Sequence, residues 1–390
     1  MDYIPFNKPF IVGKELFYIA QAVIENHHTA GDGPFTKKCQ TWLEDRLGCP
    51  KALLTHSCTA ALEMAAFLTG IGPGDEVILP SFTFVSTANA FVLRGAIPVS
   101  VDIRSDTLNI DERLIDLAIT SRTKAIVATH YAGVACAMDE IMAIADQHGL
   151  LVVEDAAQAL LSTYKGRYLG TIGHLGCLSF HETKNIISGE GGALLINDIQ
   201  FQERSEIIWE KGTNRSQFFR GQVDKYTWVD IGSSYLPSDV LAAFLYAQME
   251  NAQQIVDQRN HIFDLYLEGL RPLEEKGYLR LPIVMENSHC NGHIFYILTR
   301  SLEERINLTE FLKNKGIMAV FHYVPLHSSP AGRIYGRASG SLNVTDLVSD
   351  CLLRLPLYYE MTPDNVQYVV SEITRFYNKY DPLHFKNALL

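Results

Sequence analysis

Between Lys51 and Asp198 short apolar runs alternate with longer amphipathic ones, and this rhythm constrains the fold more than any other feature of the sequence. Several short runs are almost entirely Val, Ile and Leu, which is typical of strands covered on both faces. The predicted strands are 52–55, 76–80, 98–102, 125–129, 150–154, 175–180 and 193–196, and the clearest helices between them are 59–69, 83–93 and 138–148. Strands that alternate with helices predict an α/β fold with a mostly parallel sheet and helices on both sides. Ligands of such sheets bind beyond the carboxyl ends of the strands, so polar residues there are the first functional candidates.

The segment 212–235 breaks this rhythm. It is rich in Arg, Asn, Gln, Ser and aromatic residues and is too long for a plain connection, so we expect a functional loop. A long helix is predicted at 238–267, followed by a strand at 294–299, a helix at 303–315, a strand at 318–324 and a helix at 364–377. The chain therefore divides into a predicted large domain, 1–245, and a smaller α+β domain, 246–390.

Composition excludes several classes of function. A net charge of −11 disfavours a nucleic-acid partner, which requires a basic face. No apolar run approaches the ~18 residues of a membrane helix, and the first residues do not resemble a secretory signal. The seven cysteines are scattered without C-x-x-C pairs, and the histidines lack the spacing of metal ligands. These features predict a cytoplasmic protein with reduced thiols, no metal site and no membrane segment.

The run LLVVEDAAQ places Glu154 and Asp155 at the end of a buried strand. A carboxylate there is costly unless it meets a partner charge. One interpretation is a helix N-cap, which Asp favours. The other is a partner for the protonated pyridine nitrogen of pyridoxal phosphate, where the charge keeps the ring an electron sink.

Lys184, in SFHETKN, follows a predicted strand and precedes the glycine-rich SGEGGALLI. Most lysines are solvated surface residues, so this residue alone is weak evidence. A lysine at such a turn can nevertheless reach a cofactor aldehyde, and its amine can act as a general base when released.

The run THSCTAAL leads from a strand end into a helix. Backbone N–H groups at that helix start, with the hydroxyls of Ser57 and Thr59, predict a phosphate site, to which Ser179 adds a further hydroxyl. An ordinary N-cap is the alternative. Phe82 and Phe84, in PSFTF, lie near the same edge, where one can stack on a cofactor ring and at least one is expected in the core.

The order of these motifs resembles the sugar aminotransferases of the DegT/DnrJ/EryC1/StrS type, within fold type I of the pyridoxal-phosphate enzymes. The resemblance extends over the motifs GDGPFT, PGDEVILPSFTFVSTANA, VVEDAAQ, SFHETKN, GEGGAL and HYVPLH. It implies that Lys184 carries pyridoxal 5'-phosphate, that Asp155 pairs with the pyridine nitrogen and that Gln158 bonds the phenolic oxygen. It further implies that Phe82 stacks on the ring face and that the phosphate is bound by four residues, Ser57, Cys58, Thr59 and Ser179.

The resemblance also implies a homodimer or larger assembly with shared active sites. Family members usually carry Gly-Tyr-Asn-Tyr, whose Asn reaches a neighbouring subunit's phosphate. This chain has Ser234 at the position of that Asn, so a shorter hydroxyl side chain would have to make the contact.

The loop KGTNRSQFFRGQVDKYTWVDIGSSYL, with ETKN and SCTA, is most similar to dTDP-4-amino-4,6-dideoxygalactose transaminases of enterobacterial surface-polysaccharide pathways, such as those of common antigen or O-antigen. That branch implies dTDP-4-keto-6-deoxyglucose as acceptor and L-glutamate as donor. The cationic candidates for the diphosphate or the donor carboxylate are Lys211, Arg215 and Arg220, each of which can equally be a solvated loop charge. His322 is expected to line the pocket or to pack structurally, without a catalytic role.

Three other functions are less consistent with these residues. Some family members are dehydratases with a histidine at the position of Lys184, which this chain does not have. A catalytically inactive binding subunit does not need Lys184, Asp155 and Gln158 together, and a dinucleotide oxidoreductase would need G-x-G-x-x-G after the first strand. The gluco epimer and a different nucleotide-linked keto sugar stay open as alternatives.

Overall fold

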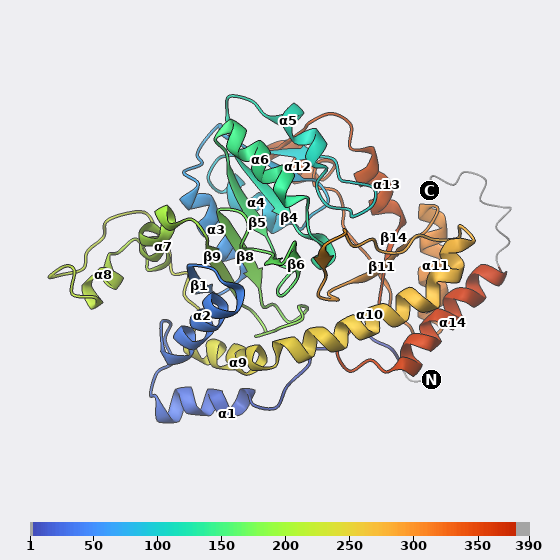
Figure 1. Ribbon diagram of the computed structural model, residues 1–390, viewed down its shortest axis with the longest axis horizontal. Helices are drawn as coiled ribbons and strands as arrows, with labels where there is room; N and C mark the ends of the chain where they lie inside the picture. The colour runs from blue at the N-terminus through green and yellow to red at the C-terminus, as the bar shows by residue number, and fades with distance from the viewer. Residues whose placement is uncertain (1–2, 380–390) are drawn as a thin grey trace.

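The computed structural model describes residues 3–379 and is built around one eight-stranded sheet (Figure 1). In spatial order its strands are β1 (Lys51–Thr55), β9 (Gly192–Ile196), β8 (Leu175–Ser179), β5 (Leu151–Asp155), β4 (Thr123–Thr129), β2 (Glu76–Pro80), β3 (Ile97–Val101) and β13 (Arg337–Ala338). Only β9 runs antiparallel to its neighbours, β1 and β8. The prediction of a mostly parallel α/β sheet is therefore confirmed, and each of its seven predicted strands forms within two residues of the expected bounds.

Helices cover both faces of this sheet because its strands are apolar on both sides. Leu54 of β1 packs into a core with α2 (Pro34–Leu47), α6 (Met138–His148) and α9 (Asp239–Glu250). Its neighbour Leu53 points the opposite way, into a core with α3 (Cys58–Leu68), α4 (Val85–Val92) and α7 (Gln202–Trp209). Each fully buried Leu contributes about 1.5–3 kcal/mol, so two-sided burial fixes the sheet firmly between its helices.

A second, three-stranded antiparallel sheet lies in the C-terminal part of the chain. Its order is β11 (Phe295–Leu298), β14 (Leu352–Leu355), β12 (Val320–Phe321). A separate core joins this sheet to α10 (Ala252–Glu275), α11 (Leu302–Asn314) and α14 (Pro363–Lys379). Figure 1 shows α10 running from beside the large sheet to this second sheet. The predicted division at 245/246 falls inside α9, and the two-domain division stays a prediction.

Two predicted elements differ from the structure. The single helix at 238–267 is wrong, because α9 ends at Glu250 and α10 begins at Ala252. Asn251 leaves the helical conformation between them (φ −110°, ψ 9°), and its side-chain amide donates to the carbonyl oxygen of Ala247 at 3.0 Å. A short polar side chain that bonds the preceding turn favours a helix end. The strand predicted at 318–324 pairs only at Val320–Phe321.

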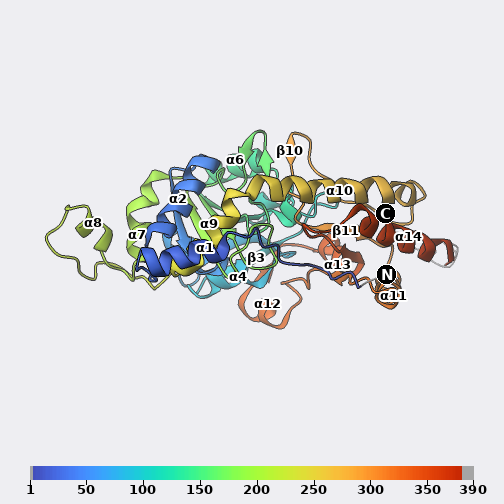
Figure 2. The ribbon, with the colours of Figure 1, turned by 90° about the horizontal axis from the view of Figure 1, so that it is seen from below.

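The remaining described elements are short. They are α1 (Glu15–Ala20), a π-helical turn (Gln21–Glu25), α5 (Ile115–Ala118), α8 (Arg215–Phe219), α12 (Pro330–Tyr335), α13 (Asn343–Cys351), the strands β6 (Thr163–Tyr164), β7 (Arg167–Tyr168) and β10 (Ser288–His289), and 3-10 turns at Glu112–Leu114, Tyr131–Gly133 and Ile199–Phe201. Figures 1 and 2 both show α8 projecting away from the body on a long loop, residues 212–235, which we call the arm. Within residues 3–379, no helix combines the length and the apolar character needed to cross a bilayer.

Candidate active site

The main cavity of the described chain has a volume of about 540 Å³ and lies at the carboxyl ends of the parallel strands. Segments far apart in sequence meet there, from the start of α3 to β14. Of the predicted site residues, those that line the cavity are Ser57, Cys58, Thr59, Asp155, Gln158, Ser179, Lys184 and His322. Those that do not are Phe82, Lys211, Arg215, Arg220 and Ser234.

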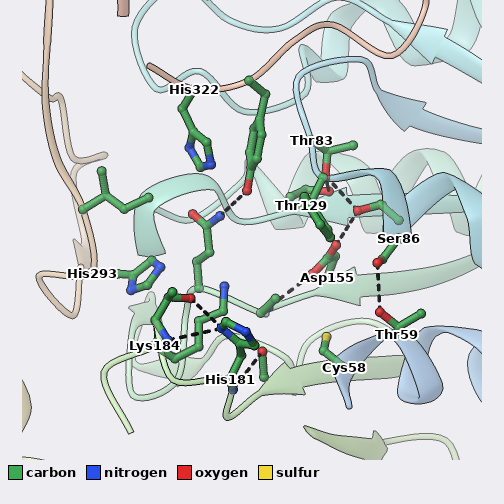
Figure 3. Close-up of a pocket in the computed structure, with 18 of the residues that line it drawn as sticks. Cys58, Thr59, Thr83, Ser86, Thr129, Asp155, His181, Lys184, His293 and His322 are labelled. Atoms are coloured by element: carbon green, nitrogen blue, oxygen red, sulfur yellow. Dashed lines mark hydrogen bonds between the residues drawn. The ribbon is translucent and has the colours of Figure 1, made fainter. Parts of the chain in front are cut away.

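The turn between β1 and α3 forms one end of the cavity (Figure 3). Ser57 is the N-cap of α3, and its hydroxyl accepts a hydrogen bond from the Ala60 amide at 3.1 Å. Thr59 shares a hydrogen bond with Ser86 at 2.8 Å. The N-cap alternative is thus realised, and the same residues also face the cavity, so capping and anion binding are compatible here.

Gly192, at the start of β9, allows the sheet to approach this turn closely. A Cβ at this position would lie 2.4 Å from the Cys58 nitrogen and 2.5 Å from the Ser57 carbonyl carbon. The turn is therefore pressed against the sheet, which fixes the direction of the first N–H groups of α3. A phosphate requires hydrogen-bond donors in fixed positions, and the hydroxyls and the backbone N–H groups at this helix start provide them.

Glu154 and Asp155 separate into two roles because successive residues of β5 point to opposite faces. The carboxylate of Asp155 faces the cavity and accepts hydrogen bonds from the Thr87 hydroxyl at 2.6 Å and the Ala157 amide at 3.2 Å. Asp155 is thus held in a fixed orientation with a face open to a cationic partner.

Glu154 is fully buried away from the cavity. It accepts from His130 at 2.8 Å and from the amides of Gly170, Ile172 and Gly173 at 2.8, 2.6 and 2.6 Å. Burial alone would raise the pKa of Glu154, but these donors hold it below its ordinary value. Glu154 therefore anchors the loop after β7 and belongs to the scaffold of the site.

Lys184 lies in the turn between β8 and β9, where its amide donates to the carbonyl oxygen of His181 at 2.8 Å. Within residues 3–379, no group accepts a hydrogen bond from its amine. Burial lowers the pKa of Lys184, against the opposing influence of Cys58 and Asp155. A lysine with a lowered pKa, facing a cavity and a fixed carboxylate, has the properties of a nucleophilic amine.

Gln158 connects the large sheet to the second sheet. Its side-chain oxygen accepts from the Ala132 amide at 2.7 Å, and its nitrogen donates to the Tyr323 hydroxyl at 2.9 Å. Tyr323, just after β12, was missed as a site residue, although the motif HYVPLH contains it. The rings of Tyr323 and His322 lie side by side, with centroids 3.4 Å apart and an angle of 33° between their planes.

Two histidines of the cavity, His293 and His322, are held in the neutral form. His322 bonds the Tyr131 hydroxyl at 3.1 Å, and His293 bonds Asn185 at 2.9 Å. Burial lowers the pKa of both rings well below the ordinary range. Neutral rings bound to neutral neighbours fit the expectation that His322 lines the pocket. No group of residues within 3–379 has the ligand arrangement of a metal site.

The position of Phe82 does not fit the prediction that this side chain stacks on the cofactor ring. Phe82 is only 1% exposed and packs edge-on against Tyr131 and Tyr323, with centroids 5.0 and 5.6 Å away. Phe84 is 56% exposed and lines the cavity. The chain leaves the strand after Pro80, so the two side chains do not share a face as they would on an extended strand.

The predicted cations of the arm lie outside the cavity of their own chain. Arg215 pairs with Glu210 at 3.1 Å, and Arg220 pairs with Glu206 at 2.8 Å. Lys211 and Ser234 are exposed at the base of the arm. The structure therefore does not bring these four residues to Lys184 within one chain.

The described residues fit pyridoxal phosphate. Hydroxyls and a helix start lie at one end of the cavity, a fixed carboxylate and an aromatic ring lie along it, and an amine without a partner lies within it. These are the groups that a phosphate, a pyridine nitrogen, a ring face and an aldehyde require.

His327, outside the cavity, bonds Ser81 at 2.8 Å and has a structural role.

Comparisons with known proteins agree with this geometry. Residues 11–374 match the model of the DegT/DnrJ/EryC1/StrS aminotransferase family. The chain is 30% identical to GDP-perosamine synthase of Escherichia coli O157:H7 over 97% of its length and 100% of that protein. Among solved structures it resembles DesV of S. venezuelae in complex with a ketimine intermediate (28% identity, 98% and 100% of the two chains, TM-score 0.88). It also resembles the pyridoxal-phosphate form of Spr1654, a putative sugar aminotransferase of Streptococcus pneumoniae (26%, 97% and 99%, TM-score 0.88).

The fold type I architecture and the pyridoxal-phosphate cofactor are thereby confirmed. Because a family model covers nearly the whole chain and the site contains the groups that the cofactor needs, the chain belongs to the DegT/DnrJ/EryC1/StrS family of sugar aminotransferases.

Proposed function

We propose that this aminotransferase transfers the amino group of L-glutamate to dTDP-4-keto-6-deoxy-D-glucose and so forms dTDP-4-amino-4,6-dideoxy-D-galactose for surface polysaccharide. The observation that carries the chemistry is Lys184, whose amine has no partner among the described residues and faces Asp155 across the cavity. The similarity of the arm and of ETKN to one branch of the family supports the substrate. We further propose that the protein acts in the cytoplasm as a homodimer.

The residues have separate tasks in this proposal. When bound, pyridoxal phosphate supplies an aldehyde and an electron-withdrawing ring. Lys184 would hold the cofactor, and its amine would move the proton of the donor Cα, a task for which its lowered pKa suits it. Asp155, fixed by Thr87, keeps the pyridine nitrogen protonated. Gln158 holds the phenolic oxygen with one edge of its amide while Tyr323 fixes that side chain.

The phosphate and the ring face complete the binding site. The turn of Ser57, Cys58 and Thr59, together with Ser179, binds the phosphate. Phe84 covers one face of the ring, because its side chain is exposed to the cavity. An aromatic side chain over a bound cofactor would help to exclude water from the reacting atoms.

Two experiments test the proposal. Borohydride reduction of the holoenzyme, followed by peptide mass analysis, should find the cofactor fixed on Lys184. A label on any other lysine would overturn the site assignment, and the absence of a label on every lysine would favour an inactive binding subunit. Incubation with dTDP-4-keto-6-deoxyglucose and glutamate, followed by NMR of the product, should show an axial amino group at C4.

The relative GDP-perosamine synthase favours a second candidate, a GDP-linked keto sugar. The same incubation with a GDP-4-keto-6-deoxy sugar distinguishes the two. Turnover of the GDP sugar alone would replace the proposed acceptor while leaving the aminotransferase assignment intact. An equatorial amino group on the dTDP product would instead identify the gluco epimer.

A further inference from the structure

Three threonines, Thr83, Thr87 and Thr129, form a group of buried hydroxyls beside Asp155. Thr129 is the last residue of β4 and is the direct partner of Asp155 in the register with β5. Thr83 lies between β2 and α4, and Thr87 lies in the first turn of α4. All three side chains line the main cavity, and Figure 3 shows Thr83 and Thr129 next to Asp155. Two strand ends and one helix start thus bring three hydroxyls to one carboxylate.

Hydrogen bonds join these hydroxyls in a single row. The Thr87 hydroxyl lies 2.6 Å from a carboxylate oxygen of Asp155 and 2.8 Å from the Thr83 hydroxyl. The Thr83 hydroxyl lies in turn 3.4 Å from the Thr129 hydroxyl. Within residues 3–379, no further hydrogen bond involves these three hydroxyls. The row therefore ends on Asp155.

The direction of the row follows from the number of protons in it. A hydroxyl has one proton to donate, and an ionised carboxylate can only accept. Thr87 therefore donates to Asp155, and its oxygen accepts from Thr83. Thr83 has then used its only proton, so Thr129 donates to Thr83. All three protons point toward the carboxylate, and hydrogen bonds aligned in this way polarise one another.

Helix capping does not account for these hydroxyls. Threonine favours the N-cap position, where its hydroxyl accepts from a backbone N–H group. The N-cap of α4 is Phe84, and no side-chain hydrogen bond caps this helix end. Thr83 and Thr87, on either side of the N-cap, bond each other instead. The neighbouring Ser86 bonds Thr59 of the phosphate turn, so the first turn of α4 supports both ends of the cofactor site.

The carboxylate of Asp155 is held from behind and is still open to a ligand. One of its oxygens accepts from Thr87 and the other from the Ala157 amide, and each has capacity for a further hydrogen bond. A hydrogen bond to an ionised carboxylate stabilises that form relative to the protonated one. A carboxylate that faces a pyridine nitrogen shares one proton with it. Donors behind the carboxylate therefore favour the arrangement in which the nitrogen carries the proton.

We propose that Thr87, Thr83 and Thr129 are positioning residues that keep this shared proton on the pyridine nitrogen of the cofactor by donating in series to Asp155. The inference rests on the pairing of Asp155 with that nitrogen in the proposed function. The row thereby maintains the ring as an electron sink, which requires a protonated nitrogen. The contribution of each hydroxyl decreases with its distance along the row, from Thr87 to Thr129.

The proton on the ring nitrogen can be observed directly. The holoenzyme is prepared with pyridoxal phosphate labelled with nitrogen-15 in the ring, because the NMR shift of that nitrogen distinguishes its protonated form from its neutral form. Wild type should show a protonated nitrogen. Thr87→Val removes the hydroxyl with little change of shape and should give a mostly neutral nitrogen. Thr87→Ser keeps the hydroxyl and should restore the wild-type shift, and Thr83→Val should fall between wild type and Thr87→Val.

Cofactor affinity gives a second measurement that does not depend on turnover. An analogue with a carbon atom in place of the ring nitrogen cannot pair with Asp155. The full-length protein, freed of cofactor, should bind pyridoxal phosphate more tightly than this analogue. In Thr87→Val the ratio of the two dissociation constants should fall about 10-fold, the order of one hydrogen bond to a charged group.

Thr309→Val is the matched control for both measurements. The Thr309 hydroxyl bonds the carbonyl oxygen of Arg305 within α11, outside the cavity, so this variant should change neither the shift nor the ratio. Should Thr87→Val fail to retain the cofactor, Thr83→Val carries both measurements, because it leaves the direct bond to Asp155 in place.

Two results would overturn the inference alone. One is a nitrogen that stays protonated in both Thr87→Val and Thr83→Val, and the other is an equal loss of affinity for the cofactor and the analogue, which would indicate a structural role. Asp155→Asn identifies a failure of the proposed function, because its nitrogen should be neutral. A nitrogen that stays protonated in Asp155→Asn, or one that is neutral in wild type, would overturn the pairing itself.

Discussion

The cavity and the arm are both polar and are both candidates for function, but they differ in how far their side chains are buried. In the cavity Asp155 is 5% exposed and accepts a hydrogen bond from Thr87. On the arm Trp228 and Phe219 are 79% and 65% exposed, although their size favours burial. Arg215 and Arg220 meanwhile pair with acidic side chains of their own chain.

The difference indicates what one chain can complete by itself. Strand ends of the large sheet position most of the cavity residues, and Tyr323, just after β12, completes the cavity from the same chain. At the base of the arm, Gly212 (φ 78°) lies against the returning chain, because a Cβ there would lie 1.9 Å from the Asp230 carbonyl oxygen. The large apolar side chains of the arm, such as Trp228 and Phe219, are not buried in a core. Exposed apolar groups on a projecting segment favour burial against another surface, and a second copy is the commonest partner.

The largest effect is expected in the cavity. Lys184→Ala should reduce transamination at least ~10⁴-fold, since cofactor attachment and proton transfer both pass through this amine. Steady-state turnover and the melting temperature measure the two consequences, and the fold should be unchanged. Lys165→Ala, an exposed lysine paired with Asp139, is the control. Residual activity above ~1% of wild type would remove Lys184 from the mechanism.

Asp155→Asn should bind the cofactor more weakly and slow the glutamate half-reaction by about 100-fold or more. An amide cannot balance the charge of a pyridinium, so the ring becomes a poorer electron sink. Stopped-flow absorbance measures the rate. A half-reaction at nearly the wild-type rate would reduce Asp155 to a structural partner of Thr87.

Mixing two inactive variants tests whether the arm of one subunit contributes to the cavity of its partner. Lys184→Ala lacks the amine, and Ser234→Trp places a large side chain where the base of the arm would meet a neighbouring cavity. If the arm completes the partner's site, mixed dimers should recover up to about a quarter of the wild-type activity by subunit statistics. Absence of recovery after verified subunit exchange would place the whole site within one chain and make the arm a peripheral feature.

The two phenylalanines of PSFTF should differ in what they affect. Phe84→Leu should weaken cofactor affinity about 10-fold, the order of one aromatic stacking contact, with little change in stability. Phe82→Leu should lower the melting temperature because it removes a buried ring, and it should leave cofactor affinity nearly unchanged. The reverse pattern would restore Phe82 as the stacking residue.

The smallest effect is expected on the arm itself. Arg215→Gln removes an ion pair with Glu210 whose arginine is partly exposed, so the free energy of unfolding of the isolated chain should change by less than about 1 kcal/mol. Urea denaturation measures it. A much larger loss would mean that the arm is held as firmly as the cavity.

The sequence predicted the parts of the site that depend on local patterns. The strands ending at Thr55, Asp155 and Ser179 were recognisable as apolar runs, and polar residues at their ends followed from the topology. Lys184 stood out through the glycines that follow it. Predicting these features requires only short sequence segments and the rule that parallel strands end at the same edge of a sheet.

Other parts depend on contacts that no local pattern encodes. Phe82 and Phe84 have the same residue type two positions apart, and only the turn after Pro80 decides which one enters the core. Tyr323 and Arg354 reach the cavity from the second sheet, across more than a hundred residues of chain. A signal for Arg354 existed in the charge within CLLRLPL, because an arginine in a buried strand calls for a specific partner.

The pairing of β1 with β9 has a consequence for the order of events during synthesis. β1 lies at the edge of the sheet and its partner is β9, with Lys51 opposite Ile196 and Thr55 opposite Gly192. A nascent chain therefore carries the β1–α3 turn without its supporting strand until Ile196 has left the ribosome. Translation at ~5–20 residues per second makes this a wait of several seconds or more, during which β1 presents unpaired backbone groups. The turn proposed to hold the cofactor phosphate is thus among the first parts of the sheet to be made and among the last to be secured, so the cofactor can be captured only by a chain whose large sheet has already closed.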